Sequence, residues 1–169
     1  MKIENLRDLF VSELCYAYDC EQKLVKKGLP AMLKSASSPE LKQAFEQHLE
    51  ETRTHVSRLE KVFNACGFEI KKKDNDILDE MTDAAEDTVS HIDESALRDA
   101  ALIVNGNGVE HYEMAIYGSL VAFADQLGLA EVSMILQQTL EEEKEADAKL
   151  TKIGESVVNP LAAGERRAA

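Results

Sequence analysis

The chain has 169 residues, enough for one domain with a hydrophobic core and too few for two comfortable ones. Its formal net charge of -13 excludes nucleic-acid phosphates and anionic lipid surfaces as favourable partners. It has three prolines and no tryptophan, and it lacks the Val/Ile/Thr-rich runs between turn residues that a β-sheet needs, so the composition predicts an all-α fold.

Cysteine usage and the N-terminal residues bear on the compartment. The first residues alternate charged and apolar side chains, without a signal-peptide core, and no later stretch approaches the ~20 apolar residues of a transmembrane helix. Cys15, Cys20 and Cys66 are odd in number and lack C-x-x-C spacing, which predicts reduced thiols. Together these features predict a cytoplasmic protein.

The first part of the chain predicts a helical hairpin. One helix is expected from a cap at Asn5 to at least Lys27, with a kink at Gly28-Leu29-Pro30, because the proline lacks an N–H. A second helix is expected from Ser38, which precedes a proline at the first helical position, to about Gly67. The short connection between them makes the pair antiparallel.

The second part predicts a crossover and another hairpin. Residues 68–94 are interpreted as a crossover with one amphipathic helix, followed by helices over about 95–126 and about 130–154. Two hairpins joined by one long crossover are typical of a ferritin-like antiparallel four-helix bundle. We therefore predict a single bundle domain over residues 1–158 and a flexible C-terminal tail over residues 159–169.

Acidic side chains lie on the apolar stripes of all four bundle helices. In the first helix, for example, Glu21 lies one turn from both Ala17 and Leu24. In the other helices the candidates form pairs three or four residues apart, a spacing that puts both side chains on one face. The candidate metal ligands are Glu21, Glu51, His55, Glu110, Glu113, Glu143 and Asp147.

Carboxylates inside a bundle are costly unless they are protonated, paired or bound to a metal. No Lys or Arg on these stripes lies at the same level to pair with several acids, so divalent cations are the simplest compensation. Superposing the two halves of the chain aligns Glu21 with Glu113 and Glu51 with Glu143. Two metal ions are predicted, with iron or manganese suiting the ligands better than zinc, which the residue types also allow.

A simpler interpretation stays open for each residue. Glu and Asp on an amphipathic helix usually form its solvated face, and His55 alone would also suit a hydrogen-bonded core histidine. His48 is expected beside the ligands or exposed, and His111 on the surface. The coincidence of acids on four helices favours the metal site over an ordinary acidic bundle.

Several runs resemble one family. Tyr18–Leu24, His48–Arg53, Val109–Glu113 and Leu140–Lys144 are similar to the YciF/YciE-like family of bacterial stress proteins, within the ferritin-like superfamily. The resemblance covers nearly the whole chain. It implies a ferritin-like bundle, a homodimer and a candidate di-iron site at Glu21, Glu51, Glu110, Glu113 and Glu143.

The chain departs from the wider superfamily in two places. The usual Glu-x-x-His pair is replaced by Glu51-x-x-x-His55 and Glu143-x-x-x-Asp147, which leaves the ligand set open. The run Asn105-Gly106-Asn107-Gly108 costs roughly 2 to 3 kcal/mol of helix propensity relative to alanine. This run predicts a bulge or break in the third bundle helix, which would offer a small oxidant a route to the site.

The leading functional hypothesis is a dinuclear centre that reacts with dioxygen or hydrogen peroxide during oxidant or metal stress, an oxidase- or peroxidase-type activity. In this hypothesis Glu51 and Glu143 bridge the ions, and Glu21 and Glu113 are terminal ligands. Glu110, His55 and Asp147 tune the coordination. The alternatives are a metal-binding or storage module without turnover, and a structural acidic bundle that acts through partner contacts.

Overall fold

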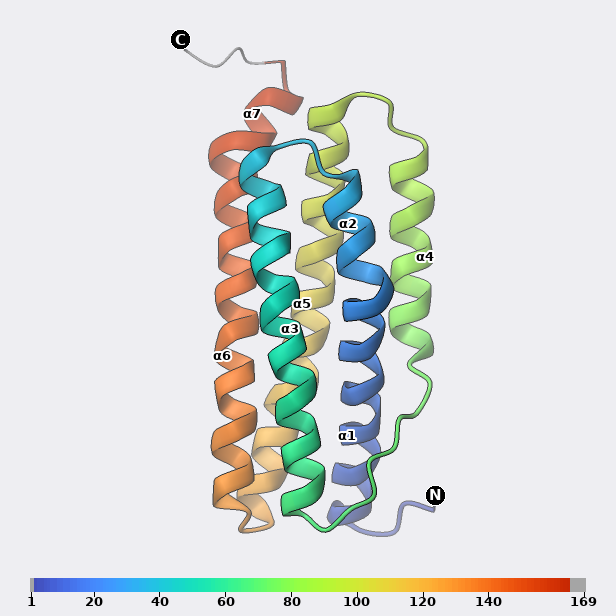
Figure 1. Cartoon of the computed structure of the whole chain (residues 1–169), viewed down its shortest axis with the longest axis vertical. Helices are drawn as coiled ribbons and strands as arrows, with labels where there is room; N and C mark the ends of the chain where they lie inside the picture. Colours follow the sequence, from blue (N-terminus) through green and yellow to red (C-terminus); the bar gives the residue numbers. More distant parts are fainter. Residues whose placement is uncertain (1, 165–169) are drawn as a thin grey trace.

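Two antiparallel helical hairpins form the bundle in the computed structural model, which describes residues 2–164 (Figure 1). The all-α prediction is confirmed. Within the first hairpin α1 contacts α3, and within the second α5 contacts α6. The two hairpins meet through contacts of α1 with α5 and of α3 with α6. The helices are α1 (Leu6–Lys23), α2 (Leu29–Ser35), α3 (Pro39–Ala65), α4 (Asp76–Ser90), α5 (Ser95–Gln126), α6 (Ala130–Ile153) and α7 (Asn159–Ala162).

The first hairpin forms where its caps predict. The Asn5 side chain accepts a hydrogen bond from the Asp8 amide at 3.0 Å, and Ser38 caps α3 through the Leu41 amide. The first helix does not end at the proline. It passes through one π-helical turn, η1 (Leu24–Gly28), and continues as α2, because a widened turn tolerates a missing N–H that a regular ladder would need.

The crossover contains one helix, as expected. α4 lies outside the four long helical columns and packs against α5 (Figure 1). Asn75 caps α4 through the Leu78 amide, and its own amide donates to the buried Asp19 carboxylate of α1 at 2.9 Å. Leu78, in the first turn of α4, is buried in the apolar core of the bundle. These contacts fix the start of the crossover helix on the bundle.

The predicted bulge in the third bundle helix is wrong, because α5 is continuous from Ser95 to Gln126. Packing against neighbouring helices outweighs the poor propensity of residues 105–108. A Cβ at Gly106 would lie 2.8 Å from Leu150 Cδ1, so the glycine allows α6 to approach closely. The Asn107 side chain donates to Thr151 at 2.8 Å. The route that a bulge would have offered to an oxidant is therefore absent from α5.

The last helix extends further than expected. α6 continues through a second π-helical turn, η2 (Gly154–Val158), into α7, and Val158 is buried. Residues 159–162 of the expected flexible tail are therefore helical, because Val158 anchors them on the bundle. Residues 165–169 lie outside the described residues. Among residues 2–164, no helix combines the length and apolar character needed to cross a bilayer.

Two apolar clusters fill the bundle, one near each end. Residues of α1, α3, α5 and α6 contribute to both, and the stretches between them in sequence carry buried polar side chains. One cluster includes Phe10, Leu14, Phe63, Leu120 and Leu136, and the other includes Leu24, Leu41, Phe45, Leu102 and Leu150. The level between the clusters is where the predicted acids meet.

Two glycines of α5 are expected to respond oppositely to substitution. Gly106→Val should lower the free energy of unfolding by about 1–3 kcal/mol, because the added atoms overlap Leu150. Gly118→Ala should raise it by about 0.5–1 kcal/mol, because its Cβ would meet no atom within 4 Å. Urea denaturation followed by circular dichroism measures both, and destabilisation by Gly118→Ala would contradict this packing.

Candidate metal centre

Six buried side chains from four helices meet between the two apolar clusters. Each is at most 6% exposed. They form two groups, and within each group the potential ligand atoms all lie within 4.8 Å of one another. One group is His48, Glu110, Glu113 and Glu143, and the other is Glu21, His55 and Glu143.

Glu143 belongs to both groups and lies between the two histidines. Its Oε1 is 3.0 Å from His55 Nδ1, and its Oε2 is 3.7 Å from His48 Nε2. Glu21 Oε1 lies 3.4 Å from the same nitrogen of His55, and Glu110 Oε1 lies 3.3 Å from the same nitrogen of His48. A carboxylate with one oxygen toward each group has the position of a bridging ligand between two ions.

Several atoms of the centre that could bind a metal ion are buried and have no hydrogen-bond partner. They include both oxygens of Glu143, Nδ1 of His55 and one oxygen each of Glu21, Glu110 and Glu113. The 3.0 Å approach of His55 Nδ1 to Glu143 is not aligned as a hydrogen bond. Because buried polar atoms in proteins are nearly always paired, unpaired atoms converging from several helices fit a cation as their partner. The residues present therefore fit a dinuclear carboxylate–histidine site.

Burial is the largest influence on the carboxyl groups. It raises the pKa of Glu113 well above its usual value, and the nearby Glu143 adds to the effect. Burial also raises the pKa of Glu110 to about 8, although His48 opposes the shift, and it raises the pKa of Glu21 against the effect of His55. Without cations Glu113 and Glu110 retain protons at neutral pH, so metal binding at these two groups must release them.

The two histidines respond to the same carboxylates. Burial alone would lower the pKa of each imidazole, but Glu21 and Glu143 outweigh it and raise the pKa of His55 to about 11. Glu51 and Glu110 similarly raise the pKa of His48 to about 9. In the metal-free protein both imidazoles therefore carry a proton that a metal ion would have to replace.

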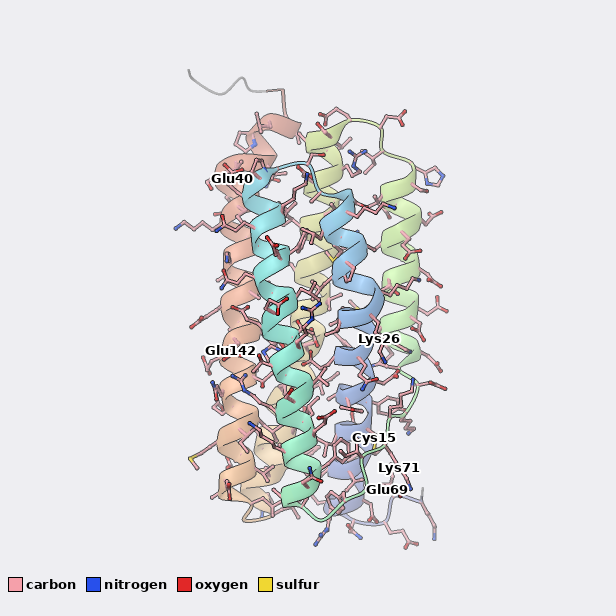
Figure 2. All side chains as sticks on the ribbon, viewed as in Figure 1. Cys15, Lys26, Glu40, Glu69, Lys71 and Glu142 are labelled. Atoms are coloured by element: carbon pink, nitrogen blue, oxygen red, sulfur yellow. The ribbon has the colours of Figure 1, made fainter. Side chains whose placement is uncertain are left out.

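A charged pair outside the centre orients His55. Its Nε2 lies 2.8 Å from Glu142, half way along α6 (Figure 2), and Arg58 donates two hydrogen bonds to that carboxylate, at 2.5 and 2.8 Å. Burial opposes ionisation of Glu142, but Arg58 and His55 lower its pKa to about 2. An ionised Glu142 accepts from Nε2–H, which leaves Nδ1 of His55 directed at Glu21 and Glu143.

Two further side chains contact the carboxylates directly. The Tyr117 hydroxyl donates to Glu21, and the Cys20 thiol lies 3.6 Å from Glu113. Burial raises the pKa of each well above its usual value, so both groups stay protonated and act as donors. These contacts restrain both carboxylates, and the Glu21 oxygen that accepts from Tyr117 is the same one that lies 3.4 Å from His55 Nδ1.

Five of the seven predicted ligands come together: Glu21, His55, Glu110, Glu113 and Glu143. Glu51 lies outside both groups, with a side chain 33% exposed that accepts from Gln47 and lies 3.4 Å from His48. Asp147 is also outside and lies 3.4 Å from His111. Of the two expectations for His48, exposure is wrong, since its side chain is buried beside Glu110 and Glu143 and belongs to one of the two groups. Its position two turns before His55 on one helix face was the available signal.

Comparison with known proteins assigns the family. Residues 5–163 match DUF892, a domain family of unknown function. The chain belongs to the DUF892 family. Protein YciF of Escherichia coli is 34% identical over 163 residues, which cover 96% of this chain and 98% of that protein. The predicted resemblance to YciF is thus confirmed, and the chain is similar to a bacterial stress protein.

Solved structures of similar proteins have the same fold. The E. coli stress protein YciF matches with a TM-score of 0.88 and 34% identity, covering 93% of this chain and 99% of that chain. YcfI of Rhodopseudomonas palustris, described as a candidate structural protein, matches with a TM-score of 0.86 and 35% identity over 89% and 95% of the two chains. A protein from Xanthomonas campestris matches at 0.73 and 25%, over 95% and 98%.

The metal-free protein is expected to lose stability as the pH rises from 6.5 to 9. The pKa of His48 is raised from 6.5 to about 9 and that of Glu110 from 4.5 to about 8, so the folded state binds these protons more tightly than the unfolded chain. Their stabilisation is present at low pH and is lost as the pH rises through the folded-state values, by on the order of 2–3 kcal/mol.

Thermal unfolding in excess chelator at several pH values measures this loss. His48→Gln should flatten the dependence, while His91→Gln, on the exposed end of α4, should leave it unchanged. A melting temperature that stays constant or increases across this range would contradict the assignment.

Proposed function

We propose that this YciF-like protein binds two iron or manganese ions in its buried centre and reacts with dioxygen or peroxide under stress. The observation that carries the proposal is the set of unpartnered buried donor atoms in two groups that share Glu143. When bound, such ions would supply redox and Lewis-acid chemistry. The chain's residues supply the geometry, the charge and the exclusion of water.

Charge balance supports two ions. Glu21, Glu110, Glu113 and Glu143, when ionised, carry as much negative charge as two divalent cations carry positive charge. With both imidazoles neutral, the filled centre would be electrically neutral, which is the condition under which burial costs least. Glu21 and His55 would hold one ion and His48, Glu110 and Glu113 the other, with Glu143 between them.

Two alternative functions have specific support. A metal-binding module without turnover would need the same centre, and it differs in consuming no oxidant over repeated cycles. A structural bundle acting through partner contacts is favoured by the description given to YcfI. In that case neither Fe²⁺, Mn²⁺ nor a chelator would change the melting temperature, whereas a filled site must raise it.

The proposal includes a cytoplasmic homodimer, as the sequence and the family resemblance predict. Leu97, Val104 and Met134 are large apolar side chains at least 49% exposed, and two of them are seven residues apart on α5. Leu97 and Val104, which lie on one face of α5, support pairing of two chains through that helix. Sedimentation equilibrium of the full chain measures the oligomeric state.

Anaerobic titration with Fe²⁺ tests the centre. The native protein should bind about two ions per chain, and Glu143→Gln should lower the occupancy of both positions, because Glu143 is shared. Glu113→Gln should affect one position. Glu131→Gln, exposed at the start of the same helix, is the matched control and should bind as the native protein does.

Retention of two tightly bound ions by Glu143→Gln would contradict the proposed centre. Oxidant consumption is measured separately, as peroxide or dioxygen lost per bound pair of ions. More than one cycle supports turnover, and a single cycle supports storage.

Arg58→Ala is expected to weaken metal binding without removing a ligand. The substitution releases Glu142, which then orients His55 less firmly, so affinity should fall roughly tenfold. Competition with a chelator of known affinity measures the change. Arg53→Ala is the control, since this guanidinium pairs with the exposed Glu50. Equal affinities for the two variants would rule out the positioning role.

A further inference from the structure

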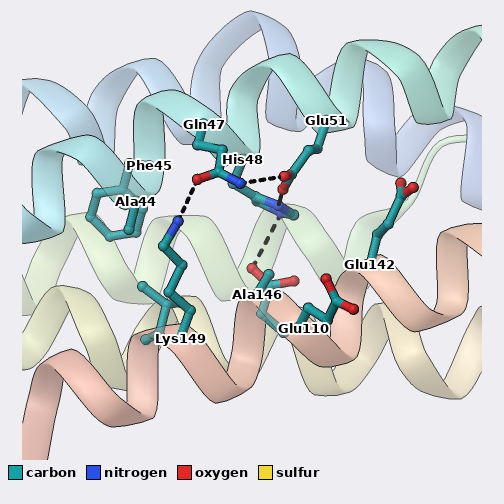
Figure 3. Close-up of a pocket in the computed structure, with 11 residues that line it drawn as sticks. Ala44, Phe45, Gln47, His48, Glu51, Glu110, Glu142, Ala146 and Lys149 are labelled. Atoms are coloured by element: carbon teal, nitrogen blue, oxygen red, sulfur yellow. Dashed lines mark hydrogen bonds and ion pairs between the residues drawn. The ribbon is translucent and has the colours of Figure 1, made fainter.

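A cavity of about 200 Å³ lies between α3 and α6 and reaches the buried centre (Figure 3). Its outer rim carries Gln47 and Glu145, which are exposed, and the half-buried Lys149. Its inner wall is formed by His48 and Glu110, both members of the candidate centre. The cavity therefore joins the surface to one of the two metal-binding groups.

The inner end of the cavity has an unpaired acceptor. Glu110 is 3% exposed, and its Oε2 atom has no hydrogen-bond partner. The other oxygen lies 3.3 Å from His48 Nε2. A buried carboxylate oxygen without a partner, on a residue that lines the cavity, is a binding position for a cation that arrives through it.

A chain of polar contacts crosses the rim. Lys149 on α6 donates to Gln47 on α3 at 2.5 Å, and Gln47 donates to Glu51 at 2.7 Å (Figure 3). The second oxygen of Glu51 faces Nδ1 of His48 at 3.4 Å. These contacts hold Glu51 at the rim, on the outer side of the same imidazole whose inner nitrogen faces Glu110.

The rim attracts cations. Glu51 and Glu145 are acidic, and Glu142, which also lines the cavity, is neutralised by Arg58. At the rim, Glu51 and Glu145 outnumber Lys149, and the protonated imidazole of His48 lies further in, on the inner wall. A concave acidic surface raises the local concentration of cations and repels anions.

We propose that this cavity is the access route for hydrated divalent cations, with Glu51 as the transit ligand at its rim and the Lys149–Gln47 bond as the latch across it. The inference rests on the proposed function of the buried centre. In this proposal Glu51, which lies outside both groups, binds each ion in passage and does not retain it.

A transit ligand and a resident ligand have different kinetic signatures. A transit ligand lowers the barrier between solution and site, so its removal slows uptake and release together and leaves the occupancy at equilibrium unchanged. Removal of a resident ligand speeds release and lowers occupancy. The two possibilities for Glu51 are therefore separable by measuring both rates.

Co²⁺ provides an optical probe, with uptake followed by stopped-flow absorbance and release followed after excess EDTA is added. Glu51→Gln should slow uptake and release roughly tenfold each, with two ions still bound at saturation. Glu46→Gln, an exposed acid on the same helix outside the cavity, is the control and should match the native rates. Circular dichroism confirms that each variant is folded.

Lys149→Gln provides an independent measurement. It removes the bond across the rim, so uptake and release should each become roughly threefold faster, and the loss of the positive charge should speed uptake more than release. Lys152→Gln, exposed on the next turn of α6, is the control.

Faster release and fewer bound ions in Glu51→Gln would make Glu51 a resident ligand and overturn the access role, while the dinuclear centre would stand. Native rates in both Glu51→Gln and Lys149→Gln would also overturn it. A native protein that binds no Co²⁺ or Fe²⁺ would refute the proposed function itself.

Discussion

Four carboxylates buried inside the bundle need positive charge beside them, and the rest of the structure depends on this constraint. Glu21, Glu110, Glu113 and Glu143 lie at one level of the bundle, each at most 3% exposed. Among residues 2–164 their charged neighbours are the two histidines, and no lysine or arginine ion pair reaches them. In the metal-free protein, bound protons can neutralise these carboxylates, but only because burial raises the carboxyl pKa values far above their usual range.

Buried acids elsewhere in the same fold are treated differently. Asp19 accepts from Lys72 and from the Asn75 amide, and Lys23 lies 2.9 Å from it. Asp99 accepts from two successive amides at the start of α3, each at 2.7 Å. These acids fix the crossover and the first hairpin connection. Asp19 and Asp99 are thus fully paired, whereas several oxygens of the centre have no hydrogen-bond partner, which supports the proposal that a cation takes that place.

The sequence predicted the helices well because their ends carry local chemistry. Asn5 and Ser38 act as caps where expected, and Gly128, with φ +72°, separates α5 from α6. The propensity of residues 105–108 failed as a guide, since contacts from distant helices decide their conformation. Helix periodicity brought four of the predicted acids and one histidine together, but it does not distinguish a neighbour at i+3 from one at i+4. On α3 the inward-facing position is occupied by Thr52, so the adjacent Glu51 lies at the rim of the cavity.

The stability cost of the centre argues against a purely structural bundle. Replacing a group of buried ionisable residues with apolar side chains of similar volume is often neutral or stabilising, so packing alone gives no reason to keep such a group. Here the costly group is supported by an oriented imidazole, donors from Tyr117 and Cys20, and a cavity that leads to it. An interior that only had to hold four helices together would need none of these, whereas the proposed metal centre would need an orienting partner, fixed carboxylates and a way in.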